Sequence, residues 1–266
     1  MLSFQRRAEI KNLLLREKTI TVSVVAEKFG VSDETIRRDL NVLSDEGFCN
    51  KTYGGASLAV RSVSSIPQRT KKDILVQEKR RMAKAAAGLI RPQDCIFLDH
   101  STTISEMCGE IKEMHLTVVT NSLWVIAELS DCENINLVIT GGHVNTDDRG
   151  LFGQECLSFL RNHHFDKVFF SCRGLQMEDG IFSTTEHSAS FYTTLSQRAE
   201  QMILLADHTK IDVPGFIRTM DYDRLDTLVT DGPLERDWMK MLERHRVSVI
   251  CAPEPEEDPE PEEESE

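Results

Sequence analysis

Seven short apolar runs recur between residues 95 and 251 of this 266-residue chain, and stretches with helical periodicity separate them. The runs are CIFLD, LTVVT, INLVIT, KVFFS, MILLA, TLVT and VSVIC, which begin at residues 95, 116, 135, 167, 202, 227 and 247. The main helical stretches are TISEMCGEIK, SLWVIAELSD, LFGQECLSFLRNHH, ASFYTTLSQRAE and LERDWMKMLERHR. Because parallel strands need helix-sized connections, this alternation predicts a doubly wound, mainly parallel α/β sheet.

Three short helices are predicted ahead of this sheet. The first begins at Ser3, which suits the N-cap position, and carries one apolar stripe. The second covers VSVVAEKF, residues 22 to 29, and Gly30 ends it; the third is capped by Ser32 and closed by Gly47. The stretch FCNKTYGGASL that follows has the composition of a β-hairpin. Three helices and a hairpin predict a winged helix.

The third helix separates its apolar from its polar side chains. Its apolar residues lie within about 60° of one another around the helix axis. The residues that point away from this stripe are Glu34, Arg37, Arg38 and Asn41. Two helices joined by a tight turn, the second of which presents Arg and Asn outward, predict a recognition helix that enters the DNA major groove. The alternative is an amphipathic helix with a solvated Arg face.

Charge is unevenly distributed along the chain. Of the formal net charge of -13, residues 253 to 266 contribute nine acids and no base, and we expect this tail to be disordered. Residues 1 to 81 hold sixteen Lys and Arg against ten Asp and Glu. A basic N-terminal end favours contact with nucleic acid there, while an ordinary solvated surface is the alternative interpretation.

Small or hydroxylated residues follow the first three predicted strands. The three sets are Asp99 with Ser101, Thr102 and Thr103; Thr120 with Asn121 and Ser122; and Thr140 with Gly141 and Gly142. Ligands of open parallel sheets bind at the carboxyl ends of the strands. Since backbone N–H groups and hydroxyls suit an anion, these loops predict a phosphate site.

The N-terminal residues 6 to 56, RRAEI through YGGA, resemble the DeoR-type winged helix-turn-helix of bacterial regulators of sugar catabolism. The match rests on VSDETIRRDL, residues 31 to 40, and on Gly54, Gly55 and Ala56. Tyr53 stands where that family usually has His, and Lys51 and Thr52 replace its more basic wing. The predicted DNA-binding residues are Ser32, Glu34, Thr35, Arg37, Arg38, Asn41, Lys51, Gly54 and Gly55.

The rest of the chain is similar to the DeoR-type sensor domain, a fold related to the sugar-phosphate isomerases. The similarity rests on IFLDHSTT, LTVVTNS, the Gly141-Gly142 pair, DGI at residue 179 and LADHTK, which ends at Lys210. It implies a pocket for a phosphorylated sugar or related metabolite. The predicted effector-binding residues are Asp99, Ser101, Thr102, Thr103, Asn121, Ser122, Gly141, Gly142, Arg173 and Lys210. The family usually has Gly in place of Ser101, and Arg173 is either a second positive group of the pocket or a surface residue.

The resemblance implies a ligand-responsive transcriptional regulator, most often a repressor, that binds double-stranded operator DNA. One alternative is a sugar-phosphate isomerase or deaminase with an appended nucleic-acid-binding module, although no acid–base pair with defined spacing is evident. The other is a protein-interaction module whose arginines bind an acidic partner. A homodimer or homotetramer is expected, because helix-turn-helix proteins bind paired half-sites.

The expected organisation is a DNA-binding domain over residues 1–57, a linker over 58–76, an effector-sensing domain over 77–252 and the acidic tail over 253–266. No apolar run is long enough for a membrane span and no signal peptide is evident, so a cytoplasmic protein is expected. The seven scattered cysteines are interpreted as reduced thiols. Neither a metal site nor a cofactor is predicted.

Overall fold

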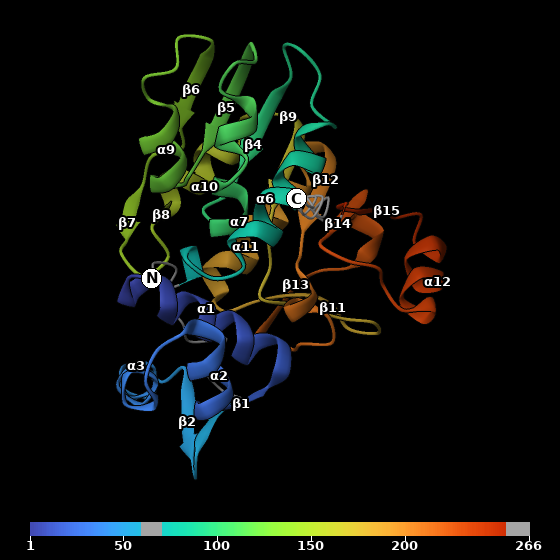
Figure 1. The fold of residues 1–266 in the computed structure, drawn as a ribbon. Coiled ribbons are helices and arrows are strands. Elements are labelled where there is room, and N and C mark those ends of the chain that lie inside the picture. The colour runs from blue at the N-terminus through green and yellow to red at the C-terminus, as the bar shows by residue number, and fades with distance from the viewer. Residues whose placement is uncertain (60–70, 254–266) are drawn as a thin grey trace, which may run out of the picture.

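The chain folds into a small N-terminal domain and a larger domain built around a seven-stranded sheet (Figure 1). This computed structural model describes residues 1–59 and 71–253. Most of the predicted linker, residues 60–70, and the predicted acidic tail from residue 254 onward lie outside the described residues. The predicted domain boundaries therefore stay predictions.

The N-terminal domain has three helices and a three-stranded antiparallel sheet. Its elements are α1 (Ser3–Glu17), β1 (Thr19–Thr21), α2 (Val22–Phe29), α3 (Asp33–Asp45), β2 (Cys49–Thr52) and β3 (Gly55–Leu58), with the strand order β1-β3-β2. Gly30 ends α2 with a left-handed φ of 62°, and the helices pack on a core that contains Ile10, Leu14, Ile36 and Leu43, each 0% exposed. The fold is the predicted winged helix, with β1 as an added strand and with Leu2 rather than Ser3 at the N-cap of α1.

Ser32 begins the third helix as the sequence predicts. Its Oγ accepts a hydrogen bond from the Thr35 backbone N–H at 3.3 Å, which satisfies one of the free donors of the first turn. We expect Ser32→Ala to lower the free energy of unfolding by about 1 kcal/mol, measured by urea denaturation. Thr21→Ala is the control, because the Thr21 side chain makes no capping bond to α2 and should cost less. Equal losses in both variants would contradict the capping role of Ser32.

The larger domain contains one parallel sheet with the strand order β15-β14-β12-β9-β4-β5-β6. In chain order its strands are β4 (Cys95–Leu98), β5 (Leu116–Thr120), β6 (Ile135–Ile139), β9 (Phe165–Phe170), β12 (Ala199–Leu205), β14 (Thr227–Thr230) and β15 (Ser248–Cys251). Each of the seven apolar runs of the sequence contains or overlaps one of these strands, so the prediction of a doubly wound sheet is confirmed.

Helices cover both faces of this sheet, because alternate strand residues point to opposite sides. In β4, Phe97 packs in one apolar cluster while Ile96 and Leu98 pack in the other. The helices α6 (Val76–Ala87), α7 (Thr102–Ser105), α8 (Cys108–Ile111) and α9 (Leu123–Leu129) contribute to the second cluster. The helices α10 (Gln154–Arg161), α11 (Glu186–Ser196) and α12 (Arg236–Arg244) contribute to the first.

Several short elements were not predicted from the sequence. They are the hairpin of β7 (His143–Asn145) and β8 (Gly150–Phe152), the small sheet of β10 (Gly174–Gln176), β11 (Gly180–Ser183) and β13 (Ile217–Met220), and the turns η1 (His208–Lys210) and η2 (Tyr222–Arg224). The predicted helix over residues 151–164 begins only at residue 154, because residues 150–152 form β8 and Gly153 has a φ of 113°. The predicted helix over residues 103–112 is divided into α7 and α8, which fits its low-propensity Thr, Ser and Gly residues.

The segment that leads into α6 packs with the N-terminal domain. Ile74 and Leu75 are 7% and 2% exposed and belong to the same apolar cluster as α1, α2 and α3. The Leu75 backbone N–H donates to Asn12 Oδ1 at 3.0 Å. These contacts fix the end of the predicted linker against the first helix. Across the two described ranges, no helix has the length and apolarity that a membrane crossing requires.

Candidate functional site

Most of the predicted DNA-binding residues gather around one hollow between α3 and the β2–β3 turn. Six of the nine predicted residues line this hollow: Glu34, Arg37, Asn41, Lys51, Gly54 and Gly55. The Lys51 Nζ donates a hydrogen bond to Asn41 Oδ1 at 3.0 Å, so the hairpin and the helix form one polar surface. Figure 1 shows α3 and β2 at the end of the molecule that is remote from the large sheet.

The two adjacent arginines of α3 extend into solvent. The side chains of Arg37 and Arg38 are 53% and 78% exposed. Arg37 lies 3.7 Å from Asp33 and Arg38 lies 3.6 Å from Glu34, at the i,i+4 spacing of a helix. Exposed pairs of this kind contribute only about 0.3–0.5 kcal/mol, so DNA phosphates can compete for the guanidinium groups. The remaining two predicted residues, Ser32 and Thr35, form the start of the helix through a 2.9 Å bond between their hydroxyls.

Asp39 has a role that the sequence reasoning missed. It belongs to the matched segment of α3, yet it is only 3% exposed and its Oδ2 accepts a 2.5 Å bond from Arg6 Nε. Arg7 approaches the other carboxylate oxygen at 3.5 Å. The pair ties the recognition helix to α1. No local pattern signals it, because 33 positions separate Arg6 from Asp39.

In the larger domain, the direction in which the chain adds strands to the sheet reverses at the central strand, β4. The chain runs from β4 to β5 and β6 at one edge and then returns to β9 on the other side of β4. Open α/β sheets bind ligands beside the carboxyl ends of the strands at such a reversal. Asp99 follows β4 directly, is 0% exposed, and accepts a 2.9 Å bond from the Ser171 N–H, which follows β9. The reversal is therefore held together by the Asp99 carboxylate.

Asp99 is fully engaged with the protein. Besides Ser171, it accepts bonds from the Ser101 N–H at 2.8 Å and from the Tyr192 hydroxyl at 2.7 Å. Burial and the nearby Asp99 charge raise the pKa of Tyr192, which keeps this hydroxyl protonated as a donor. Asp99 thus braces three segments around the predicted site. Its prediction as a direct ligand contact remains untested.

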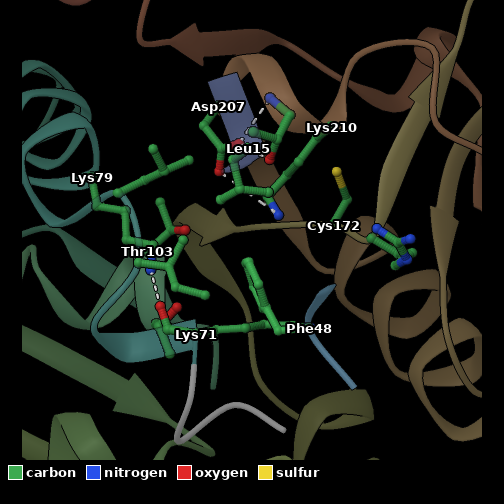
Figure 2. Close-up of a pocket in the computed structure, with 13 residues that line it drawn as sticks. Leu15, Phe48, Lys71, Lys79, Thr103, Cys172, Asp207 and Lys210 are labelled. Carbon is green, nitrogen blue, oxygen red and sulfur yellow. Dashed lines mark hydrogen bonds and ion pairs between the residues drawn. The ribbon is translucent and has the colours of Figure 1, made fainter. Parts of the chain in front are cut away.

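A cavity lies beside this brace, at the carboxyl ends of β4, β9 and β12 (Figure 2). Four predicted effector-binding residues line it: Thr102, Thr103, Arg173 and Lys210. In Figure 2, Lys79, Lys71 and Thr103 lie on one side of the space, and Lys210 and Cys172 lie on the other. The polar and charged lining residues that the sequence reasoning did not select are Lys71, Lys79, Asp207 and Thr209.

The other predicted effector-binding residues shape the surrounding loops instead of lining this cavity. Ser101 and Ser122 cap α7 and α9 by accepting bonds from backbone N–H groups at 3.2 and 3.3 Å. Gly141 and Gly142 have positive φ angles of 73° and 105°, and a Cβ on Gly142 would lie 2.2 Å from the Phe152 carbonyl oxygen. Asn121 donates to the Leu151 carbonyl at 3.2 Å, whereas its buried Oδ1 has no hydrogen-bond partner among the described residues.

One carboxylate lies among the cations of the cavity. Burial opposes ionisation of Asp207, but the Lys210 charge, the Thr209 hydroxyl bond and the Lys79 charge outweigh it, so the pKa of Asp207 is lowered. Lys210 Nζ lies 3.8 Å from Asp207 Oδ2. Asp207 therefore carries a negative charge at neutral pH and orders the lysines around it.

Two lysines of the cavity titrate unusually low. Burial, reinforced by the positive charges of Lys210 and Arg173, lowers the pKa of Lys71 to about 7. Burial lowers the pKa of Lys79 to about 8, although Asp207 partly offsets this effect. Titratable groups with shifted pKa values often mark a functional site, and an anion bound beside these lysines would favour their charged forms. The adjacent lysines at positions 71 and 72 were the local sign of these cavity cations in the sequence. They were not selected, because they stand in the predicted linker.

Among the described residues, neither a reactive cysteine in the cavity nor a cluster of metal ligands is found. All seven cysteines are free thiols, and burial raises the pKa of Cys172 in the cavity wall to about 12, which makes it a poor nucleophile. Within residues 1–59 and 71–253, no group of three or more His, Cys, Asp or Glu side chains is arranged to hold a metal ion.

Comparison with known proteins identifies the two domains in which these candidate sites lie. Residues 6–61 match the DeoR-like helix-turn-helix domain, and residues 75–232 match the DeoR C terminal sensor domain. The uncharacterized HTH-type transcriptional regulator YulB of Bacillus subtilis (strain 168) is 32% identical over 95% of this chain and 98% of its own. A putative aga operon transcriptional repressor of Escherichia coli O157:H7 is 30% identical over 92% of this chain and 93% of its own.

A third relative is the glycerol-3-phosphate regulon repressor of Escherichia coli (strain K12), which is 26% identical over 93% of this chain and 98% of its own. All three relatives are helix-turn-helix regulators or operon repressors by name and none is an enzyme, so the isomerase alternative is not supported. The two domain matches, together with relatives aligned over nearly their whole length, show the family. The chain belongs to the DeoR family of helix-turn-helix transcriptional regulators.

Proposed function

We propose that this protein is a cytoplasmic repressor of a carbohydrate catabolic operon, and that a phosphorylated sugar or related metabolite in the cavity modulates it. The observation that carries the proposal is the pairing of two built surfaces in one chain. One is the exposed basic and amide face of α3 and the β2–β3 hairpin. The other is a cavity at the reversal point of the sheet, which four cationic side chains and one carboxylate line: Lys71, Lys79, Arg173, Lys210 and Asp207.

The proposed DNA contact places α3 in the major groove with Arg37, Arg38 and Asn41 toward base edges. Arg and Asn side chains read guanine and adenine edges there, and Lys51 on the hairpin suits a phosphate. A homodimer or homotetramer would present two such helices to paired half-sites. Gel-shift titration against the upstream region of the protein's own operon tests this part. The absence of a salt-sensitive, sequence-specific shift would count against it.

Removing one arginine should weaken binding to the specific site. We expect Arg37→Ala and Arg38→Ala each to reduce operator affinity by about tenfold, as befits the loss of a contact to a base or phosphate. Arg161→Ala is the matched control, because Arg161 lies exposed on α10 of the other domain. If both α3 variants bound operator as tightly as Arg161→Ala, the recognition role of α3 would be refuted.

The proposed effector class follows from the charge of the cavity. Lysine ammonium groups and threonine hydroxyls suit the oxygens of a phosphate group. Thermal-shift screening against sugar phosphates and their unphosphorylated sugars tests it, because a ligand that binds only the folded state raises the melting temperature. Stabilisation by phosphorylated compounds alone is expected. Equal stabilisation by the free sugars would assign the cavity to neutral ligands.

A further inference from the structure

The effector cavity has a wall that does not belong to the sensor domain. Besides its polar lining, it is closed by Leu15, Phe48, Ile74 and Leu75. These four residues are members of the apolar cluster of the N-terminal domain. Phe48 lies three residues after the end of α3, and in Figure 2 it lies on the opposite side of the space from Asp207 and Lys210. The cavity therefore lies between the DNA-binding domain and the sensor domain of one chain.

Lys71 and Lys79 lie where these two domains meet. Lys79 is 4% exposed on the first turns of α6, and its Nζ donates a hydrogen bond to the Lys71 carbonyl oxygen. Their ammonium groups share the cavity with Arg173 and Lys210, and the Arg173 Nε is buried without a hydrogen-bond partner among the described residues. Four lining cations against one lining carboxylate leave a formal excess of positive charge, which an anion of two charges would reduce but not cancel.

The start of α6 connects this charge to the DNA-binding domain. Leu75, directly before α6, has left-handed angles of φ 52° and ψ 41°, which a branched side chain rarely adopts. The bond from Leu75 N–H to Asn12 and burial of the Leu75 side chain hold this conformation. One turn later, Glu78 Oε1 accepts a 2.7 Å hydrogen bond from the guanidinium group of Arg16 in α1, so the two side chains form an ion pair. A displacement of Lys79 therefore acts on the contacts of α1.

The cavity is too small for a sugar phosphate in this arrangement. Its volume is about 50 Å³. Small-molecule sites usually occupy roughly 300–1,000 Å³, whereas a cavity of roughly 10–15 Å³ already holds one water molecule. A ligand larger than a phosphate group fits wholly inside the cavity only if a wall moves. The sensor-domain wall is built on packed strand ends, whereas the opposite wall is a separate domain joined at a strained residue.

We infer that Lys71 and Lys79 bind the anionic group of the effector together with Lys210 and Arg173, and that the bound effector displaces the DNA-binding domain from the sensor domain within the same subunit. This inference rests on the proposed function and adds the anchoring residues and the direction of the signal. Because the effector binds only the separated arrangement, its binding energy shifts the equilibrium toward that arrangement. The position of α3 relative to the sensor domain then depends on effector occupancy.

Anion binding by lysine variants tests the anchoring residues. The probes are inorganic phosphate, glucose 6-phosphate and fructose 1-phosphate, titrated calorimetrically into the full-length protein at pH 7. We expect Lys71→Met and Lys79→Met each to weaken binding of the strongest probe at least tenfold, since each removes a buried charge–phosphate contact. Lys84→Met is the matched control, because Lys84 is exposed on the same helix, and it should bind like the unmodified protein. Operator binding without probe reports whether each variant is folded.

Hydrogen exchange of the Leu75 amide tests the displacement. If the domains separate, the bond from Leu75 to Asn12 breaks, and peptides containing Leu75 should exchange at least fivefold faster at saturating probe. Asn12→Ala calibrates this readout, because it removes the acceptor without altering the cavity lining.

The possible failures are distinguishable. If the unmodified protein binds none of the three probes, the effector part of the proposed function fails together with this inference. If the unmodified protein binds a probe while both lysine variants bind it equally well, only the anchoring residues are refuted. If Leu75 exchange is unchanged or slower at saturation, the displacement is refuted and the sensor function stands.

Discussion

Asp39→Ala is expected to remove most of the operator binding, by a hundredfold or more, although Asp39 does not face the DNA. The side chains of Arg6 and Asp39 are 9% and 5% exposed, so the substitution leaves a guanidinium group buried opposite an empty space. Removing one partner of a buried ion pair costs about 3–5 kcal/mol. Small domains have roughly 5–15 kcal/mol of stability in total, so α3 would lose its support from α1. Urea denaturation and gel-shift titration measure the two effects.

Two further variants separate the ion pair from a general effect of losing a carboxylate. Asp45→Ala removes an exposed acid near the end of the same helix and should leave both stability and DNA binding unchanged. Arg6→Met combined with Asp39→Leu removes both charges and should recover most of the lost stability, because no unpaired charge remains. Were Asp39→Ala to unfold at the same urea concentration as Asp45→Ala, the pair would be shown to contribute nothing to the domain.

The sequence predicts the local structure of the DNA-binding domain well and its long-range contacts poorly. The bounds of α2 and the start of α3 follow from Gly30 and Ser32, because caps act within one turn of the helix that they end or begin. β1 is missed, since a three-residue strand depends on its pairing with β3 and not on its own composition. The Arg6–Asp39 pair is also missed, because its two residues are 33 positions apart and meet only in the folded domain.

For the effector site, the sequence predicts where the residues lie but not what each side chain contacts. Residues after parallel strands are predictable in position, because all strand ends meet at one edge of the sheet. Whether such a residue contacts the ligand or braces its loop depends on the direction of the side chain. Thr102 and Thr103 line the cavity, whereas Asp99 and Asn121 point to neighbouring backbone. The sequence pattern is the same for both groups, so it locates the site without assigning the roles.

The excess of Lys and Arg over Asp and Glu in residues 1–81 does not come mainly from the DNA-binding domain. Of the sixteen Lys and Arg residues before position 82, seven lie between residues 60 and 81 with only two acids, whereas residues 1–59 hold nine bases and eight acids. Two of those seven, Lys71 and Lys79, face the cavity. The excess was interpreted as contact with nucleic acid, and the structure shows that part of it surrounds the candidate effector site. Composition alone cannot separate two anionic partners of one chain.

The affinity for an anion should fall by roughly five-hundredfold between pH 7 and pH 9 if Lys71 and Lys79 hold it, about fiftyfold through Lys71 and about tenfold through Lys79. Both lysines must be protonated to bind an anion, and their pKa values are lowered to about 7 and about 8. Below pH 7 both carry a proton and binding is strongest. As the pH rises through these values, binding must take up protons, so affinity falls by up to about tenfold per pH unit for each lysine. Sulfate is the suitable probe, because it stays dianionic throughout.

Stability of the unliganded protein should change in the opposite direction. The folded-state pKa of each lysine lies below the ordinary value of 10.5, so the unfolded chain binds more protons from pH 7 upward and the folded state becomes more stable as the pH rises toward 10. Other charged groups act on this pair and set the size of the effect: Asp73, Glu106, Asp148, Arg173, Asp207 and Lys210. Thermal melts with and without sulfate at each pH measure both trends in one experiment.

Opposite trends identify the lysines better than either trend alone, because a general loss of structure at high pH would lower both quantities together. Lys84→Met should keep both pH dependences, while the double variant Lys71→Met/Lys79→Met should lose them, since methionine does not titrate. A sulfate affinity that stays constant from pH 7 to pH 9 in the unmodified protein would mean that the lysines are already protonated or lie outside the site. The anion would then be held by Arg173 and Lys210, and the link from the cavity through α6 to the DNA-binding domain would have no anchor.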